Sequence, residues 1–269
     1  WLAVVFIPFL AGGMLSNASQ LLGHFAFNGI APNLLFVGLA IVAFALSFAP
    51  RKIIVGLSVV AVLASLILAN ILGTALPAWH VTAVAFSEWG GATVLALVAS
   101  GLGMGLYWQS SLPALKQQDA ATQTALPIWI AQLFAVIAFA FFAANAAIPS
   151  FTFVVAVLSV SALLLNMARE QLLQRQLNIA IQWLVILAAV FIWAIPAISP
   201  IFNTLLMLWG LVICLIYAVF AGWIMKISHL RKSMNFSNEL FYNLWRIAVR
   251  VVLPLSIVMA IVAILGQLI

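Results

Sequence analysis

The sequence predicts an all-α, polytopic membrane protein, in which about nine transmembrane helices form a single integral domain over residues 1–269. Hydrophobic residues make up 67% of the chain and charged residues only 5%. So few charges leave too little polar surface for a water-soluble domain of this length. The apolar residues fall into windows of about 20 residues, the length that crosses a hydrocarbon core of roughly 30 Å.

The expected spans follow one another from the first residues of the chain to the last. The first apolar run lacks the basic start of a cleavable signal and is longer than such a signal, so we expect it to be a true span. Short polar or Gly/Pro-containing segments separate the spans. The windows cover residues 2–23, 30–49, 53–75, 84–108, 126–147, 150–169, 178–198, 201–226 and 246–268.

The positive charges support this series of spans, because Lys and Arg in short loops concentrate on the cytoplasmic side of a membrane. All 10 cations lie in or beside every second loop, and the loops between them carry none. With an odd number of spans, this alternation predicts a cytoplasmic N-terminus and an external C-terminus. The net charge of +6 is therefore a topology signal. It does not indicate nucleic-acid binding, because the cations are scattered and form no basic face with interleaved aromatic residues.

The most informative segment, Val94–Leu112, begins in the fourth window and continues past its end. Gly101, Gly103 and Gly105 stand at alternate positions in its middle, and each glycine disfavours a helix by about 1 kcal/mol relative to alanine. An interrupted helix at bilayer depth is tolerated where it faces protein or a water-filled cavity, so we expect a transport site here. The alternative is simple helix packing, because Gly101 and Gly105 also form a small-xxx-small pair.

Three stretches of this chain resemble the neurotransmitter:sodium symporter family, particularly its bacterial members with eleven helices. The residues SGLGMG (100–105), followed by SSL (110–112), resemble the unwound sixth helix of that family. The run LVICLIYAVFAGWIMKISHLRKSMN (211–235) resembles its tenth helix, where a Gly-Trp pair precedes a basic segment. The run FYNLWRIAVRVVLPL (241–255) resembles the start of its eleventh helix.

The resemblance implies a symporter-like fold with a broken helix near 100–105, located in the bacterial inner membrane. The spans correspond to the first, second and fifth to eleventh helices of the family, so the third and fourth are absent. Loss of two consecutive spans preserves the topology predicted from charge. The implied substrate-binding residues are Asn17, Gln20, Ser100, Gly101, Gly103, Met104 and Gly105. The implied ion-binding residues are Ser100, Ser159 and Ser161, with sodium as the candidate ion and no other cofactor.

The chain also departs from the family pattern. In the first span, Gly12-Gly13 could open the helix as in the family, but Gln20 falls near the position of the outer-gate arginine. In the sixth family helix, Ala99 replaces a hydroxyl residue of the first sodium site. In the eighth, Val160 replaces one member of the Thr/Ser pair of the second site. Sodium requires several hard oxygen ligands, so these changes weaken the expected ion site.

Other polar residues allow a functional or a structural interpretation. Asn17 and Gln20 share a helix face by their i, i+3 spacing, and the family arrangement would turn them toward Ser100 and Ser159. Most buried polar residues in membrane helices simply join one helix to another. Glu88 could carry a proton, but its position near the start of a span favours an interfacial acid stabilised by the helix dipole.

The sequence thus favours two functions. The first is a sodium- or proton-coupled transporter for a small amino acid or amine. The second is a transporter-derived, non-transporting accessory or regulatory subunit of a larger membrane complex, with other subunits as its partners. We expect no enzyme, because no nucleophile with its base and no phosphate-binding loop is recognisable. We also expect no metal cluster, because the only cysteine is Cys214 and the histidines are dispersed.

Overall fold

The computed structural model describes residues 1–25, 29–72, 85–86, 88–90, 92–93, 150–195, 199–226 and 238–266. The regular secondary structure in these ranges is helical, and they contain no strand. Two helices end in or pass through a π-helical turn, and one ends in a 3-10 turn, all labelled η. The elements are α1 (Leu2–Phe25), α2 (Pro32–Ser47), α3 (Arg51–Leu72), α7 (Ser150–Gln174), α8 (Ile179–Phe191), η2 (Ile192–Ala194), α9 (Ser199–Val219), η4 (Phe220–Ile224), α11 (Glu239–Ile247), η5 (Ala248–Val252) and α12 (Leu253–Gly266).

The predicted all-helical class is confirmed for this part of the chain. Four of the described helices are long and apolar enough to cross a membrane. They run over Val4–Gly23, Phe153–Gln174, Pro200–Ile224 and Glu239–Gly266. α2 and α8 with η2 are shorter apolar helices inside predicted windows, and α3 fills most of the window 53–75. The window 126–147 and most of 84–108 lie outside the described residues.

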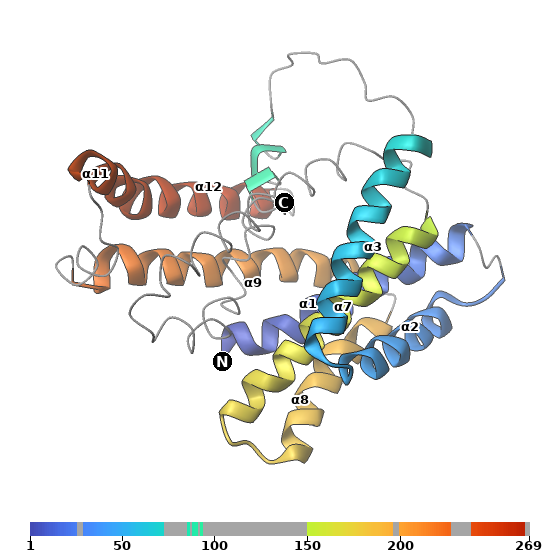
Figure 1. Cartoon of the computed structure of the whole chain (residues 1–269). Helices are drawn as coiled ribbons and strands as arrows, with labels where there is room; N and C mark the ends of the chain where they lie inside the picture. The colour runs from blue at the N-terminus through green and yellow to red at the C-terminus, as the bar shows by residue number, and fades with distance from the viewer. Residues whose placement is uncertain are drawn as a thin grey trace.

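Helices α1 and α7 are the centre of the described bundle. α1 packs against α7, α2, α8 and α9, while α7 also packs against α3 and α2. Within the apolar stretches of these two helices, 72% and 61% of the residues are buried, compared with 33% for α9 and 22% for the last helix. α9 and α12 pair with each other to one side (Figure 1). The outer helices therefore expose most of their apolar surface, as expected where lipid is the solvent.

Helix α1 is continuous from Leu2 to Phe25, so the predicted opening at Gly12-Gly13 is wrong. The two glycines instead leave room for the indole ring of Trp193, which comes from η2 and packs directly against them. A Cβ atom on Gly12 would lie 2.6 Å from Trp193 Cδ1, and one on Gly13 would lie 3.0 Å from Trp193 Cζ2. Packing against a large buried ring thus explains the pair, and the helix stays intact because its backbone can approach η2 closely.

The last helix begins at Glu239, seven residues before the predicted window 246–268. The Asn238 side chain accepts a hydrogen bond of 2.8 Å from the Leu240 backbone N–H, which caps the helix. Glu239 in the first turn is stabilised by the helix dipole. Apolar content alone therefore placed the start too late, because the first two turns carry polar and charged residues.

Candidate functional site

Asn17 and Gln20 lie together on one face of α1, as their spacing predicts, and both are exposed. Ser159 of α7 is completely buried and bonds within its own helix, so the expectation that these amides face Ser159 is wrong. No hydrogen bond joins either amide to another of the described residues. They form a polar face in the C-terminal half of α1, whose apolar stretch is 72% buried. Amide groups favour water or a protein partner over hydrocarbon. The remaining predicted substrate residues, Ser100, Gly101, Gly103, Met104 and Gly105, lie outside the described residues.

Ser159 and Ser161, the other two predicted ion ligands, are completely buried in α7. Ser159 Oγ donates a hydrogen bond of 2.9 Å to Ala156 O of the same helix. Its oxygen lone pairs stay available as acceptors. Ser161 Oγ is buried and has no hydrogen-bond partner among the described residues. An unsatisfied buried hydroxyl costs about 1–3 kcal/mol, so this oxygen is the best candidate in α7 for a cation or water ligand.

Helix α1 carries two further buried hydroxyl groups, at Ser16 and Ser19. Ser19 Oγ donates to Ser16 O at 2.7 Å. α1 and α7 pack along each other. Both of these central helices therefore contribute buried serine hydroxyl groups, Ser16 and Ser19 from α1 and Ser159 and Ser161 from α7. These oxygens are hard ligands of the kind that alkali cations and protonated water prefer. Groups of three or more His, Cys, Asp or Glu side chains that could hold a metal are absent from the described part of the chain.

Aromatic side chains fill the space between α1, η2 and α9. Phe9 contacts Trp193, Trp209 and Phe202, with ring centroids 5.0, 5.5 and 5.9 Å apart. The indole N–H groups of Trp193 and Trp209 are buried without a partner among the described residues. Trp193 lies inside the predicted window 178–198, and hydropathy does not predict this packing role. The signal that could have found it is Gly12-Gly13 in the facing helix, because adjacent glycines leave room for one large ring.

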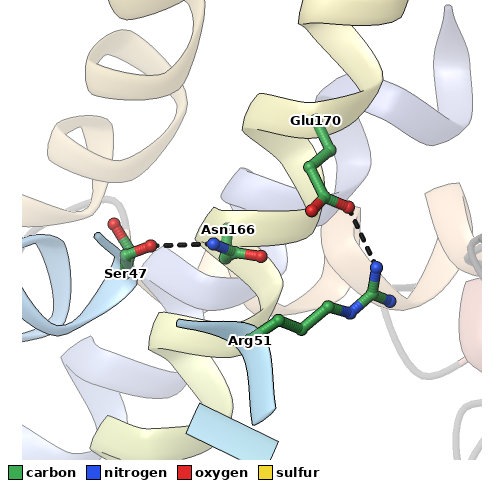
Figure 2. A network of polar contacts seen from close by, with 4 residues as sticks. All are labelled: Ser47, Arg51, Asn166 and Glu170. Carbon is green, nitrogen blue, oxygen red and sulfur yellow. Dashed lines mark hydrogen bonds and ion pairs between the residues drawn. The ribbon is translucent and has the colours of Figure 1, made fainter. Parts of the chain in front are cut away.

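At one end of the bundle, charged residues of two predicted cytoplasmic loops lie close together, among them Arg51 and Glu170 (Figure 2). Arg51 Nη1 of α3 lies 3.0 Å from Glu170 Oε2 of α7. Asn166 Nδ2 donates to Ser47 O at 2.9 Å, which ties α7 to the end of α2. These contacts bring the loop after the second span to the same end as the loop after the sixth, as the alternation of charge requires.

The N-terminus lies at this same end of the bundle. The Arg175 guanidinium lies 4.7 Å from the ring centroid of Trp1, and that of Arg169 lies 4.9 Å from the centroid of Phe48. Such cation–π contacts contribute about 0.5–1 kcal/mol at exposed sites. The N-terminus and the loops after the second and sixth predicted spans thus share one end of the bundle.

Glu88 is exposed and its carboxylate accepts a hydrogen bond of 3.1 Å from the backbone N–H of Ala85. Trp89 N donates to Ala85 O at 3.1 Å, so Glu88 lies in the first turn of a helical segment. A carboxylate that accepts an unpaired N–H at a helix start is the arrangement of a capping acid. The interfacial interpretation of Glu88 is therefore favoured over a proton carrier.

Comparison of the chain with protein-family models, with curated proteins and with solved structures finds no match. The similarity to the symporter family therefore depends on the motifs at 100–112, 211–235 and 241–255.

Proposed function

We propose that this protein is a sodium- or proton-coupled secondary transporter for a small amino acid or amine, built on a shortened form of the symporter fold. The substrate would bind where the segment 100–105 meets the polar face of Asn17 and Gln20. Coupling ions would use hydroxyl oxygens of α7, Ser159 and Ser161, with Ser100. Transport would require the helices around this site to move relative to the rest of the bundle.

The observation that carries the proposal is the polar content of the two central helices. Ser161 of α7 has a completely buried hydroxyl without a partner among the described residues. Asn17 and Gln20 of α1 meanwhile are exposed and bond to no described residue. Polar groups at membrane depth are costly and commonly mark a solute pathway. The pairing of α1 with α7 also agrees with the family arrangement of the first and eighth helices.

The test is uptake by purified protein in liposomes. Labelled amino acids and small amines are offered under an inward sodium gradient, an inward proton gradient, or neither. Accumulation that requires one gradient and collapses with the matching ionophore is the expected result. Absence of uptake, combined with no thermal stabilisation by any amino acid in the presence of sodium, would argue strongly against transport.

A pair of serine variants tests the ion site. Ser161→Ala removes the hydroxyl that has no partner, so we expect weaker ion dependence of uptake without loss of stability. Ser65→Ala is the matched control, because the buried Ser65 hydroxyl donates to Ala61 O at 2.8 Å within α3. Equal ion dependence in both variants would remove Ser161 from the site.

The proposed location is the bacterial inner membrane, with the N-terminus in the cytoplasm. Cysteine labelling in a Cys214→Ser background tests this orientation. Lys52→Cys lies at the end of the bundle that includes Trp1, while Ala31→Cys lies at the other end of α2, and both positions are exposed. A membrane-impermeant thiol reagent is expected to label Ala31→Cys in intact spheroplasts and Lys52→Cys only after lysis. The reverse pattern would invert the topology.

A second candidate function is a non-transporting accessory subunit of a larger membrane complex. It is favoured by the unbroken α1, in which Gly12-Gly13 is filled by Trp193. A closely packed first helix has less freedom to open around a solute than the broken helix of the symporters. A stoichiometric partner that co-purifies in mild detergent, together with absent uptake, would favour this role over transport.

A further inference from the structure

The ends of α9 and α11 meet at two facing π-helical turns, η4 and η5, where two helices carry local irregularities side by side. Pro254 explains the second of them. Its nitrogen cannot donate to the carbonyl of Arg250, four residues earlier, and its ring crowds that carbonyl. The turn widens, and Leu253 N donates to Ala248 O in the π pattern. Trp223 Nε1 of η4 donates to the freed Arg250 O at 3.1 Å.

The contact is reciprocal, because Arg250 in turn binds the end of α9. Arg250 Nε donates to Gly222 O at 2.6 Å, and the guanidinium lies 5.9 Å from the Trp223 ring centroid. A Cβ on Gly222 would meet Arg250 Cγ and Val249 O at 3.2 Å, so glycine allows the two turns to touch. π-helical turns are rare and often occur at functional sites. Here they fix one arginine in a defined orientation.

A small open pocket lies at this junction, and its walls are aromatic and cationic. Its lining includes Gly222, Tyr242, Trp245, Arg246 and Arg250. Arg246 is exposed and Arg250 half-buried, and neither forms an ion pair with a described residue. The Nη groups of Arg250 are left with no bond to the described residues, because its single hydrogen bond uses Nε. A guanidinium held in this way offers its planar fork to a phosphate.

The position of the pocket along the helix indicates the environment of its ligand. The helix Glu239–Gly266 has 28 residues, which is about 42 Å at 1.5 Å per residue. A hydrocarbon core of roughly 30 Å leaves about two turns outside it. If the apolar C-terminal part spans the core, Tyr242, Trp245 and Arg246 lie at headgroup level. Trp and Tyr are enriched at that level in membrane proteins.

Exposed apolar side chains surround the basic residues on the same helix. On the side of Arg246 that faces the membrane core, Ile247, Val251, Val252 and Leu255 are each more than half exposed, at 55%, 54%, 53% and 57%. A free inorganic anion would gain nothing from these groups, whereas the acyl chains of a lipid would cover them. The chemistry of the junction therefore fits a ligand with a phosphate at one end and hydrocarbon at the other.

We propose that the junction of η4 with α11 and η5 is a binding site for an anionic phospholipid. Arg246 and Arg250 bind the headgroup phosphate, Tyr242 and Trp245 flank it at the interface, and the exposed apolar residues on the core side of Arg246 contact the acyl chains. The charge pattern places the Glu239 end of this helix at the cytoplasmic leaflet, which is the anionic one. The site is separate from the α1–α7 centre, so its occupation does not depend on transport.

The experiment is a lipid titration of the purified full chain in detergent, read by native mass spectrometry. Phosphatidylglycerol and phosphatidylcholine with identical acyl chains are compared. We expect preferential binding of phosphatidylglycerol, and about fivefold weaker binding after Arg246→Gln, the loss expected for one cation at a membrane surface. Arg250→Gln is expected to weaken binding at least as much. Arg246 makes no bond to the described fold, so its variant keeps the test valid even where Arg250→Gln fails to fold.

Lys52→Gln is the matched control, because it removes an exposed cation at the start of α3. It should leave phosphatidylglycerol binding unchanged. Equal binding of the two lipids would overturn the proposal, and so would an undiminished preference in Arg246→Gln or a loss of equal size in Lys52→Gln. A third measurement adds inorganic phosphate in place of lipid. If millimolar phosphate stabilises the protein against heat as much as phosphatidylglycerol does, the site binds a soluble anion and the lipid proposal fails.

Discussion

Gly12→Ala is the most direct test of the way in which α1 is packed. A methyl group at this position would lie 2.6 Å from Trp193 Cδ1 and 3.0 Å from both Cα and O of Val190. The indole cannot easily move away, because Trp193 is 2% exposed and packs against Phe9 and Phe202 at centroid distances of 5.0 and 5.5 Å. The Val190 atoms belong to the backbone, so α1 and α8 would have to separate.

The expected magnitude is the difference of two opposing effects. Overpacking of a well-packed site costs about 1–3 kcal/mol, and immobile neighbours place Gly12 at the upper end of that range. Alanine is the better helix former by about 1 kcal/mol, which offsets part of the cost. The net loss in the free energy of unfolding is then about 2 kcal/mol. For a chain of this size, that lowers the melting temperature by about 4–8 °C.

The assay is thermal unfolding of the purified variants in one detergent. Gly38→Ala is the matched control, because a Cβ there would meet nothing within 4 Å. That variant should gain up to about 1 kcal/mol from helix propensity alone. A double variant with Trp193→Ala should lose most of the Gly12→Ala penalty, because the ring that clashes is gone. If Gly12→Ala matches or exceeds the stability of Gly38→Ala, the close packing described for α1 is refuted.

Two further predictions concern single contacts and use the same thermal assay. Trp223→Phe should cost about 1 kcal/mol, because Arg250 O loses its donor. The cost of Trp223→Phe should nearly vanish in a Pro254→Ala background, because residue 254 then has an N–H that can donate to the Arg250 carbonyl. An unchanged cost in that background would show that Pro254 is not the reason why this carbonyl needs Trp223 as its donor. Glu170→Gln should cost less than about 1 kcal/mol, because the paired side chains are 37% and 41% exposed. A loss above 2 kcal/mol would mean that the Arg51 pair is far better shielded than its exposure indicates.

Hydropathy predicted the helices of the described chain well, because a helix surrounded by hydrocarbon needs nearly continuous apolar side chains. It failed at the ends and irregularities. The start of the last helix depends on Asn238 and Glu239, which are cap residues with little hydropathy signal. The widened turn before Pro254 could have been anticipated from that residue alone, since a proline frees the carbonyl four positions earlier. The donor to that carbonyl, Trp223, could not, because it comes from another helix.

The site residues divide in the same way. Spacing alone placed Asn17 and Gln20 on one helix face. Spacing could not predict that Asn17 and Gln20 would both be exposed. It also could not predict that Ser159 would form a hydrogen bond within its own helix while Ser161 has no partner among the described residues. The meaning of Gly12-Gly13 was reversed by the structure. A glycine pair can break a helix or admit a neighbour, and only the position of Trp193 distinguishes the two.

The sequence by itself indicated a lipid environment, the helical class and the alternation of charge, because these properties depend on composition and on spacing along the chain. The tertiary structure decided which helices are central, which polar groups find partners and which arginines have no acidic partner among the described residues. These properties depend on contacts between segments far apart in sequence, such as Arg51 with Glu170 or Gly222 with Arg250. Such contacts are set by side-chain shape across a helix interface, which an apolar sequence pattern does not encode.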